Sequence, residues 1–302
     1  MAAMKERVGF IGVGLMGHGM AKNILEGGHP LTILGNRNRA PIEDLLSRGA
    51  EEATNAAELA AKSDIVFLCL PGSPQIEAII RNAGGLKEGL KESSVVVDCS
   101  TADPTSTLAL AAELKSAGVD LVDAPLGRTP KEAWDGTLDA MVGADDDVFA
   151  RVEPVIDLWA GKILHIGKTG DGHKMKLLNN FLSLGYAALY AEAITLGQKV
   201  GLSPDVFDSV IRGGRMDCGF YQTYMGYLIE GNREAHKFTL TNALKDLRYL
   251  ESMADATGMV NPVGNAAKNT FAAAVAGGGD GAEDYVPHLV DFVAKLNGTK
   301  LH

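Results

Sequence analysis

The chain has 302 residues, of which 46% are hydrophobic and 22% are charged, with a formal net charge of -10. This length can support two folded domains, and the composition is that of a globular protein rather than a disordered or fibrous one. The acidic balance argues against nucleic acid or an anionic membrane surface as a partner. Three scattered cysteines without metal-ligand spacing, and no segment resembling a signal peptide or a membrane span, predict a soluble cytoplasmic protein.

A glycine-rich turn follows the first β-rich run of the sequence, residues 8–11. The turn contains Gly12, Gly14 and Gly17 and leads into a helical pattern that continues to residue 25. In a strand–turn–helix unit the first glycine permits the tight turn, the second lets a pyrophosphate approach the backbone, and the third lets the helix pack on the strand. The glycine triplet is a weak signal alone, but in this context it predicts a dinucleotide site that also includes Leu15 and Met16.

The turn after the second predicted strand, residues 31–34, indicates which dinucleotide would bind. Enzymes that prefer NAD usually place an acidic residue here to hold the ribose hydroxyls. This chain instead has Asn36, Arg37 and Arg39 and no carboxylate between residues 35 and 39. Arg37 can pair with a 2′-phosphate and stack on adenine, whereas the alternative is a solvated basic turn. Asn36 and Arg37 are therefore expected to contact the cofactor, with NADP(H) favoured and NAD(H) as the alternative.

Strand and helix patterns then alternate through the first half of the chain. Further strands are predicted at residues 65–70, 94–98, 120–124, 140–143 and 163–165, and helices at 40–48, 56–62 and 146–158. Such alternation predicts an α/β fold with a doubly wound, Rossmann-type parallel sheet and ligands at the carboxyl edge of its strands. Two strands end at this edge in the pairs Leu70-Pro71 and Ser100-Thr101, where the nicotinamide is expected.

The second half of the chain has no convincing strand pattern. An apolar run without proline predicts a long helix from Asp171 to Lys199, with the Asp171 side chain as its N-terminal cap. Further helices are predicted at 242–257 and 285–296, separated by a glycine-rich acidic loop at 277–287. We expect a dinucleotide-binding domain at 1–168 and an all-helical substrate and oligomerisation domain at 169–302, joined by the long helix.

Four polar residues share one face of this long helix, because they stand three, four and seven positions apart. They are Lys176, Asn179, Asn180 and Ser183. Buried polar groups are costly unless they are paired, so a polar stripe among leucines indicates a function unless it is simply solvated.

Motifs along nearly the whole chain, in one order, resemble those of the β-hydroxyacid dehydrogenase family. They comprise residues 9–17, Asp123-Ala124-Pro125, Gly136-Thr137-Leu138, Met141-Val142-Gly143, Gly170-x-Gly172, Lys176 with Asn179-Asn180, and Lys245-Asp246. The resemblance implies an NAD(P)-dependent oxidoreductase that interconverts a small anionic β-hydroxyacid and its semialdehyde. It also implies that Lys176 is the general acid and base.

The substrate loop departs from the family pattern. The family commonly has Ser-Gly-Gly where this chain has Gly127-Arg128-Thr129, a loop similar to that of sulfolactaldehyde reductase. An arginine there supplies a forked cation suited to a carboxylate, sulfonate or phosphate. The alternative is a salt bridge from Arg128 to a neighbouring carboxylate, such as Glu132 or Asp135. This loop favours a longer or more strongly anionic semialdehyde than that of 3-hydroxyisobutyrate.

The expected mechanism places Lys176 opposite the nicotinamide. During reduction its ammonium would stabilise the growing negative charge on the aldehyde oxygen and donate the proton, and in oxidation the neutral amine would act as base. Burial and a nearby cation would bring its pKa toward the working range. Asn180 would orient Lys176 or the substrate oxygen, while Asn179 and Ser183 would bind the polar end of the substrate.

Other groups have supporting or structural roles in this interpretation. Lys245 would reach the cofactor from the helical domain, no metal is needed, and His165, His173 and Asp98 are expected to be structural or surface groups. The alternatives are a non-catalytic dinucleotide-binding module and an imine reductase-like relative, and the presence of Lys176 speaks against both. We also expect at least a homodimer, since the long apolar helix needs partners on more than one face. Dimer and tetramer are not distinguished.

Overall fold

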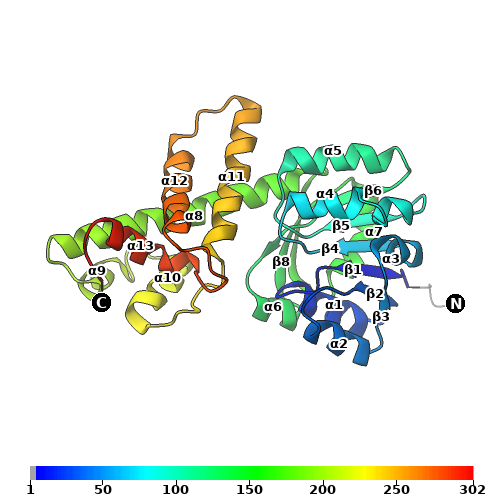
Figure 1. Cartoon of the computed structure of the whole chain (residues 1–302), viewed down its shortest axis with the longest axis horizontal. Coiled ribbons are helices and arrows are strands. Elements are labelled where there is room, and N and C mark those ends of the chain that lie inside the picture. Colours follow the sequence, from blue (N-terminus) through cyan, green and yellow to red (C-terminus); the bar gives the residue numbers. More distant parts are fainter. Residues whose placement is uncertain (1–4, 302) are drawn as a thin grey trace. The chain divides into compact units, whose positions relative to one another are not determined.

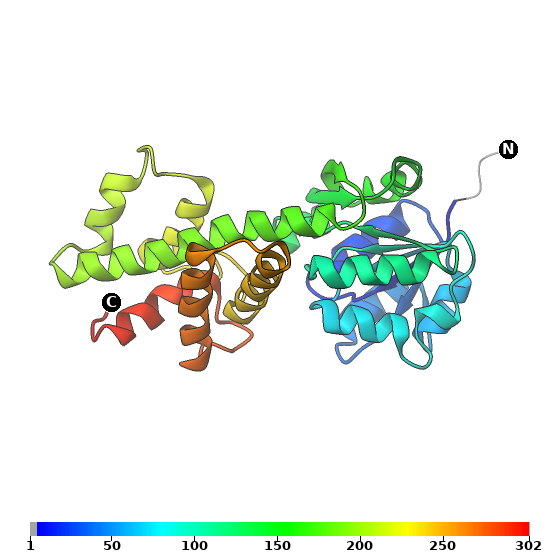
Figure 2. The ribbon, with the colours of Figure 1, turned by 90° about the horizontal axis from the view of Figure 1, so that it is seen from above.

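The computed structural model describes residues 5–301, which fall into two compact units divided between Lys176 and Leu177. The division lies inside one long helix, α8 (Asp171–Lys199), which is drawn as a single continuous ribbon in Figures 1 and 2. The predicted bounds of this helix are confirmed. Its first residues belong to the first unit and the remainder to the second.

The first unit is a mixed sheet with helices on its faces (Figure 1). In the described part of the chain the sheet has nine strands in the order β3-β2-β1-β4-β5-β6-β8-β7, with β9 beside β8. Strands β1 to β6 pair in parallel, and β8 runs antiparallel to β6 and β7. The predicted α/β, Rossmann-type class is confirmed, since the parallel part has the doubly wound order 3-2-1-4-5-6. The strands are β1 (Val8–Ile11), β2 (Leu31–Leu34), β3 (Glu51–Ala53), β4 (Ile65–Leu68), β5 (Val95–Asp98), β6 (Asp120–Asp123), β7 (Leu126–Gly127), β8 (Leu138–Gly143) and β9 (Ala160–Gly167).

Helices cover both faces of this sheet, so its central strands are buried on both sides. All residues of β1, β4 and β5 are buried, which explains their continuous apolar sequence. One apolar cluster contains Phe10, Phe67 and Trp159, and a separate cluster contains Leu59 and Leu110. The helices of this unit before α8 are α1 (Gly17–Glu26), α2 (Ala40–Ser47), α3 (Ala56–Lys62), α4 (Ser73–Arg81), the 3-10 turn η1 (Leu86–Glu88), α5 (Pro104–Lys115), α6 (Pro130–Asp135) and α7 (Asp146–Ile156).

Several short or proline-containing elements of the first unit, among them β3, β7 and α4, were not predicted from the sequence. Strands β3 and β7 have three and two residues, too short for a pattern of alternation to emerge. The helix α4 begins at Ser73, between two prolines that would ordinarily indicate a loop. Pro74 lies in the first helical turn, where its missing N–H is not needed.

Among the described residues of the second unit, the regular secondary structure is helical, apart from one isolated β-bridge between Thr239 and Tyr285. Its largest buried side chains, Tyr221, Tyr224 and Phe271, belong to one apolar core. The last helix was predicted at 285–296 but begins only at Leu289, because a 3-10 turn precedes it. After α8 the elements are α9 (Pro204–Ile211), α10 (Gly219–Glu230), α11 (Leu240–Thr257), α12 (Pro262–Ala276), η2 (Val286–His288) and α13 (Leu289–Leu296).

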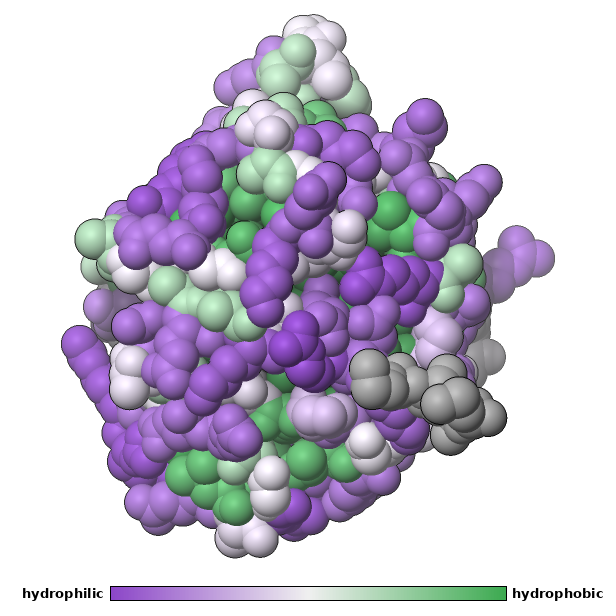
Figure 3. All heavy atoms as spheres, turned by 90° about the vertical axis from the view of Figure 1, so that its right-hand side faces the viewer, coloured by the Kyte–Doolittle hydropathy of each residue, from purple (hydrophilic) through white to green (hydrophobic). Residues whose placement is uncertain are grey.

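The surface is mainly polar on the face of the first unit that Figure 3 presents, where hydrophilic side chains surround small hydrophobic patches. Among the described residues, no helix is both long and apolar enough to cross a membrane.

Candidate active site

The glycine-rich turn between β1 and α1 is closed on one side and open on the other. A Cβ on Gly12, whose φ is +100°, would lie 2.2 Å from the carbonyl oxygen of Cys69, and a Cβ on Gly17 would lie 2.1 Å from that of Gly12. Nothing lies within 4 Å of the corresponding position on Gly14. Leu15 is 76% exposed, and the first turn of α1 has no acidic residue. The turn therefore fits an anionic pyrophosphate at the start of α1.

The two arginines after β2 have different surroundings. The guanidinium of Arg39 pairs with Glu52 through two contacts, 2.6 Å from Nη1 to Oε1 and 2.9 Å from Nη2 to Oε2. Arg37 is exposed, and its backbone N–H donates to Oδ1 of Asn36 over 2.8 Å. Arg39 is thus committed to a neighbouring carboxylate, and the side chain of Arg37 remains the cation that points to solvent beside this turn.

The ends of β4 and β5 are joined by the side chain of Ser100. Its Oγ accepts the backbone N–H of Leu70 over 2.9 Å, and its own N–H donates to Oδ1 of Asp98 over 3.0 Å. Ser100 is only 4% exposed, whereas Pro71 is exposed and Thr101 is half-buried. The structure therefore brings Leu70-Pro71 and Ser100-Thr101, the two pairs expected near the nicotinamide, to one edge of the sheet. The hydrogen bond from Leu70 to Ser100 links them.

The partner of Arg128 differs from both predicted carboxylates. Its Nε lies 3.0 Å from Oδ1 of Asp139 in β8, in an ion pair about half exposed on the arginine side. Glu132 instead accepts the N–H and hydroxyl of Thr129 at the start of α6, and Asp135 pairs with Lys131. The alternative of a salt bridge to a nearby carboxylate is therefore observed, with Asp139 as the partner, because Glu132 and Asp135 already bind groups of their own helix.

Arg128 also has an unusual backbone. Its φ is +77°, a left-handed conformation that costs a residue other than glycine free energy. Gly127, which precedes it, is half-buried beside the side chain of Asp139. Backbone strain of this kind is a feature of functional loops, and here it accompanies the charged residue that the sequence singled out.

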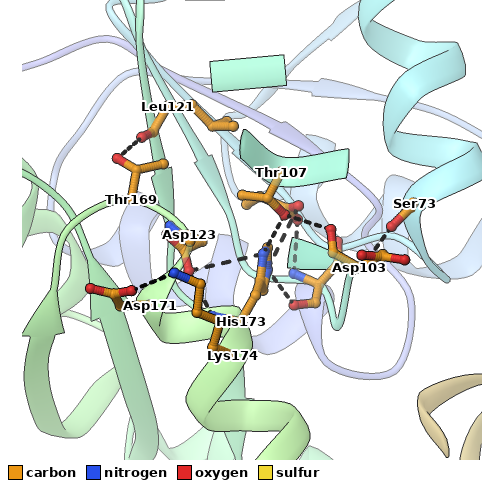
Figure 4. A network of polar contacts seen from close by, with 12 residues as sticks. Ser73, Asp103, Thr107, Leu121, Asp123, Thr169, Asp171, His173 and Lys174 are labelled. Carbon is orange, nitrogen blue, oxygen red and sulfur yellow. Dashed lines mark hydrogen bonds and ion pairs between the residues drawn. The ribbon is translucent and has the colours of Figure 1, made fainter. Parts of the chain in front are cut away.

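The start of α8 is held by Asp123 at the end of β6, not by Asp171 as predicted. Oδ1 of Asp123 accepts the N–H of Gly170 and Oδ2 accepts that of His173, each over 2.6 Å (Figure 4). Asp171 instead accepts the N–H of Lys168, which precedes the helix, and pairs with Lys174. The predicted capping role was wrong because a carboxylate from 47 residues upstream occupies that position.

Burial raises the pKa of Asp123, while its two backbone donors and His173 oppose that shift. Asp123 is 0% exposed, as is His173, and Asp98 is 2% exposed. His165 differs, since it is partly exposed and stacks on Phe149 with ring centroids 4.2 Å apart. The predicted structural character of His173 and Asp98 agrees with their burial. Asp123 was quoted only as part of a motif, and its hydrogen bonds to α8 were not predicted.

Lys176 lies in the second turn of α8, half-buried, at the end of the first unit. In the second unit, Nδ2 of Asn180 donates to Oδ2 of Asp246 over 2.7 Å, and both residues are buried. The ammonium of Lys245 lies 3.1 Å from the other oxygen of Asp246. Asp246 thus brings together two predicted site residues, Asn180 and Lys245.

The two remaining predicted residues of α8 are less enclosed. Asn179 is exposed, and Ser183 is half-buried with its hydroxyl donating to the carbonyl of Asn180 over 3.1 Å.

Comparison with known proteins identifies the family. Residues 7–167 match the family profile described as the NAD binding domain of 6-phosphogluconate dehydrogenase. Residues 170–287 match the profile described as the NAD-binding region of NADP-dependent 3-hydroxyisobutyrate dehydrogenase. The chain belongs to the β-hydroxyacid dehydrogenase family. It is accordingly an NAD(P)-dependent oxidoreductase.

Individual members of the β-hydroxyacid dehydrogenase family resemble the chain over most of its length. It is 38% identical to 2-(hydroxymethyl)glutarate dehydrogenase of Eubacterium barkeri over 68% of each protein. It is 30% identical to 3-sulfolactaldehyde reductase of Escherichia coli over 90% of this chain and 91% of the relative. The structure of Mycobacterium tuberculosis 3-hydroxyisobutyrate dehydrogenase with L-serine matches with a TM-score of 0.84 and 27% identity, covering 95% of this chain and 98% of that one.

Proposed function

We propose that this member of the family transfers hydride reversibly between NADP(H) and a small anionic hydroxy acid or its semialdehyde, with Lys176 as general acid and base. The observation that carries the proposal is the placement of Lys176. It stands on the second turn of a helix whose start is fixed to the carboxyl ends of β5 and β6. Ligands of doubly wound sheets bind at this edge.

The glycine-rich turn and Arg37 support the choice of cofactor. Gly14 leaves space for a pyrophosphate, and the start of α1 favours an anion there. The 2′-phosphate of NADP would meet the exposed Arg37, while Glu52, which would repel it, is neutralised by Arg39. Replacing Arg37 with alanine should weaken NADPH binding about tenfold and leave NADH binding nearly unchanged, because one charged contact is worth roughly 1.5 kcal/mol or more.

Each residue of the proposed site would have its own role in the reaction. A bound nicotinamide supplies the hydride or accepts it. Lys176 would hold the substrate oxygen and give it a proton during reduction, or remove that proton during oxidation. Asn180, whose amide nitrogen is held by Asp246, would present its oxygen along the same helix face. Lys245 would contact the cofactor from the helical unit, and Asn179 and Ser183 would bind the polar end of the substrate.

Arg128 would select the anionic end of the substrate. Asp139 contacts only its Nε, so the two Nη groups can form a forked pair with a carboxylate or sulfonate. Gly127 and Thr129 would complete this loop. Such an arrangement favours a longer or more strongly anionic semialdehyde or its hydroxy acid, and the names of two relatives contain anionic compounds of these kinds, 3-sulfolactaldehyde and 2-(hydroxymethyl)glutarate.

The proposal also includes a homodimer or homotetramer. Large apolar side chains of α8 are exposed at positions spaced by four or seven, which places them on one helix face. They are Leu178, Leu182, Leu189 and Leu196, with exposures of 46%, 57%, 61% and 63%. A face of this kind favours burial against a second chain. A monomer in light scattering at micromolar concentration would contradict this part of the proposal.

The substrate class is tested by following NADPH and NADH oxidation with a panel of semialdehydes that carry a carboxylate or a sulfonate. Turnover of at least one anionic member, with Arg128→Ala raising its KM about tenfold or more, is the expected result. Asp139→Asn is the matched variant, because it removes the charge that competes for Arg128 and should not raise KM. Equal KM values for wild type and Arg128→Ala on every substrate would contradict the assigned role of the loop.

A further inference from the structure

His173 occupies a closed polar site beneath the start of α8, where three other elements meet (Figure 4). The ring is 0% exposed. Its Nε2 lies 3.1 Å from the carbonyl oxygen of Ser100, after β5, and its Nδ1 lies 2.8 Å from the hydroxyl of Thr107 in α5. Its backbone N–H is one of the two that Asp123 accepts. A single residue therefore joins α8 to β5, β6 and α5.

The hydrogen bonds place one ring proton on Nε2 and allow a second on Nδ1. The Ser100 carbonyl can only accept, so Nε2 carries a proton. The Thr107 hydroxyl has one proton, which it can donate to the carbonyl oxygen of Asp103 over 3.1 Å. When that proton goes to Asp103, the hydroxyl must accept from Nδ1. Both ring nitrogens are then donors, and the ring is an imidazolium.

The charged groups around the ring favour the same state. Oδ2 of Asp98 in β5 lies 3.8 Å from Nε2, and Oδ2 of Asp123 in β6 lies 3.9 Å from Nδ1. Both oxygens of Asp123 accept backbone N–H groups, as an ionised carboxylate does best. A neutral ring would leave two buried carboxylates side by side without a cation, which is costly.

Among the described residues, the contacts of α5 and α8 around this cluster introduce no competing charge. Thr107 of α5 is uncharged, and on α8 itself Asp171 and Lys174 pair with each other over 2.8 Å. The cluster defined by Asp98, His173 and Asp123 is thus a buried triad in which two carboxyl groups flank one imidazole ring.

The triad connects two parts of the proposed active site. The carbonyl oxygen of Ser100 accepts a hydrogen bond from the His173 ring. The Oγ of the same residue accepts the N–H of Leu70 at the edge of the sheet where the nicotinamide is expected. Lys176 stands one helical turn after His173, at the three-residue spacing that places side chains on neighbouring positions of a helix. A shift of the first turn of α8 against β5 would therefore move Lys176 relative to the cofactor edge.

We propose that His173 is a positioning residue, held as a buried imidazolium between Asp98 and Asp123, which fixes Lys176 against the cofactor edge. The inference rests on the proposed function, because it takes Lys176 as the acid and base. The structural part, the charge of the ring, can be tested without any turnover.

The charge is read from nitrogen NMR of the full chain labelled with ¹⁵N-histidine. At pH 8 an ordinary histidine, with a pKa of about 6.5, is almost entirely neutral. We expect one of the seven histidines to keep both ring protons at pH 8. The signal should vanish in His173→Gln and persist in His18→Gln, which removes the histidine paired with Asp44. Seven neutral rings at pH 8, or a charged ring lost in His18→Gln, would overturn the inference.

The positioning role is tested by charge compensation. His173→Gln leaves two buried carboxylates without their cation, so we expect kcat to fall about tenfold or more with NADPH affinity nearly unchanged. Adding Asp98→Asn removes one of these carboxylates while its amide oxygen can still accept the N–H of Ser100. The double variant should therefore recover part of the lost kcat.

A residue that only filled space would behave differently, because the second substitution would then add its own loss to the first. A double variant slower than His173→Gln alone would overturn the positioning role. Lys176→Ala distinguishes a failure of the proposed function from a failure of the inference on His173. If that variant keeps wild-type turnover, the proposed function fails while the NMR result on His173 still stands.

Discussion

Two places along α8 carry buried polar anchors, and they differ in chemistry. At its start, in the first unit, Asp123 accepts two backbone N–H groups and the His173 ring lies between two carboxylates. Further along, in the second unit, the side chain of Asn180 donates to the side chain of Asp246. The first anchor holds the backbone of the helix, whereas the second holds one side chain of the proposed site.

This difference predicts which property each anchor controls. Removing a backbone anchor frees the helix start, so stability of the first unit and turnover should fall together. Removing a side-chain anchor leaves the helix in place, so turnover should fall while the first unit keeps its stability. Both tryptophans of the chain, Trp134 and Trp159, lie in the first unit, so their fluorescence follows the unfolding of that unit alone.

The largest effect on stability is expected for Asp123→Ala. The variant leaves the N–H groups of Gly170 and His173 without their acceptor and the buried ring without one of its carboxylates. We expect the free energy of unfolding of the first unit to fall by about 3 kcal/mol or more, measured by tryptophan fluorescence in urea. Asp123→Asn should lose less, because its amide oxygen still accepts one N–H. An Asp123→Ala protein as stable as wild type would show that the anchor is dispensable.

A smaller and different effect is expected for Asp246→Ala. The amide nitrogen of Asn180 then has no carboxylate to hold it, and Lys245 loses its ion pair. We expect kcat to fall about tenfold, while the tryptophan unfolding midpoint of the first unit does not change. Arg248→Ala, an exposed position on the same helix, is the matched control and should retain wild-type kcat. A shifted tryptophan midpoint in Asp246→Ala would erase the distinction between the two anchors.

The sequence predicted what depends on neighbouring residues. The glycine turn of residues 12–17, the apolar strands and the long helix follow local patterns, and the structure has each of them. Local patterns also singled out Lys176 and Arg37 as candidate site residues, because a lysine on an apolar helix face and an arginine after a strand are visible in a short stretch of sequence.

Contacts between distant residues were not predictable in this way. Asp123 and His173 are 50 residues apart, and their contact depends on which strands end at the same edge of the sheet. The carboxylates given as examples in the alternative for Arg128, Glu132 and Asp135, are its neighbours in sequence, whereas the actual partner, Asp139, lies on the antiparallel strand β8. Asp171 was predicted as a cap from its position at the start of a helix, and the sequence could not reveal that another carboxylate takes that place.

The smallest effect, on thiol reactivity, compares the two units directly. Burial raises the pKa of Cys99 well above its ordinary value and that of Cys69 to about 12, so these thiols of the first unit should be unreactive while it is folded. Cys218 in the second unit is exposed. We expect iodoacetamide to modify Cys218 first, at least tenfold faster than the others, as followed by peptide mass spectrometry. Equal rates for all three cysteines would mean that the thiols of the first unit are as accessible to the reagent as Cys218 in the second.

The most direct test of the central claim is the turnover of Lys176→Ala and Lys176→Arg, with NADPH binding measured on the same samples. Arginine keeps the positive charge but cannot release its proton at ordinary pH, so it separates proton transfer from charge stabilisation. We predict that both variants bind NADPH like wild type and lose about a thousandfold or more in kcat. Turnover of Lys176→Ala within tenfold of wild type would contradict the assignment of Lys176 as the acid and base of this enzyme.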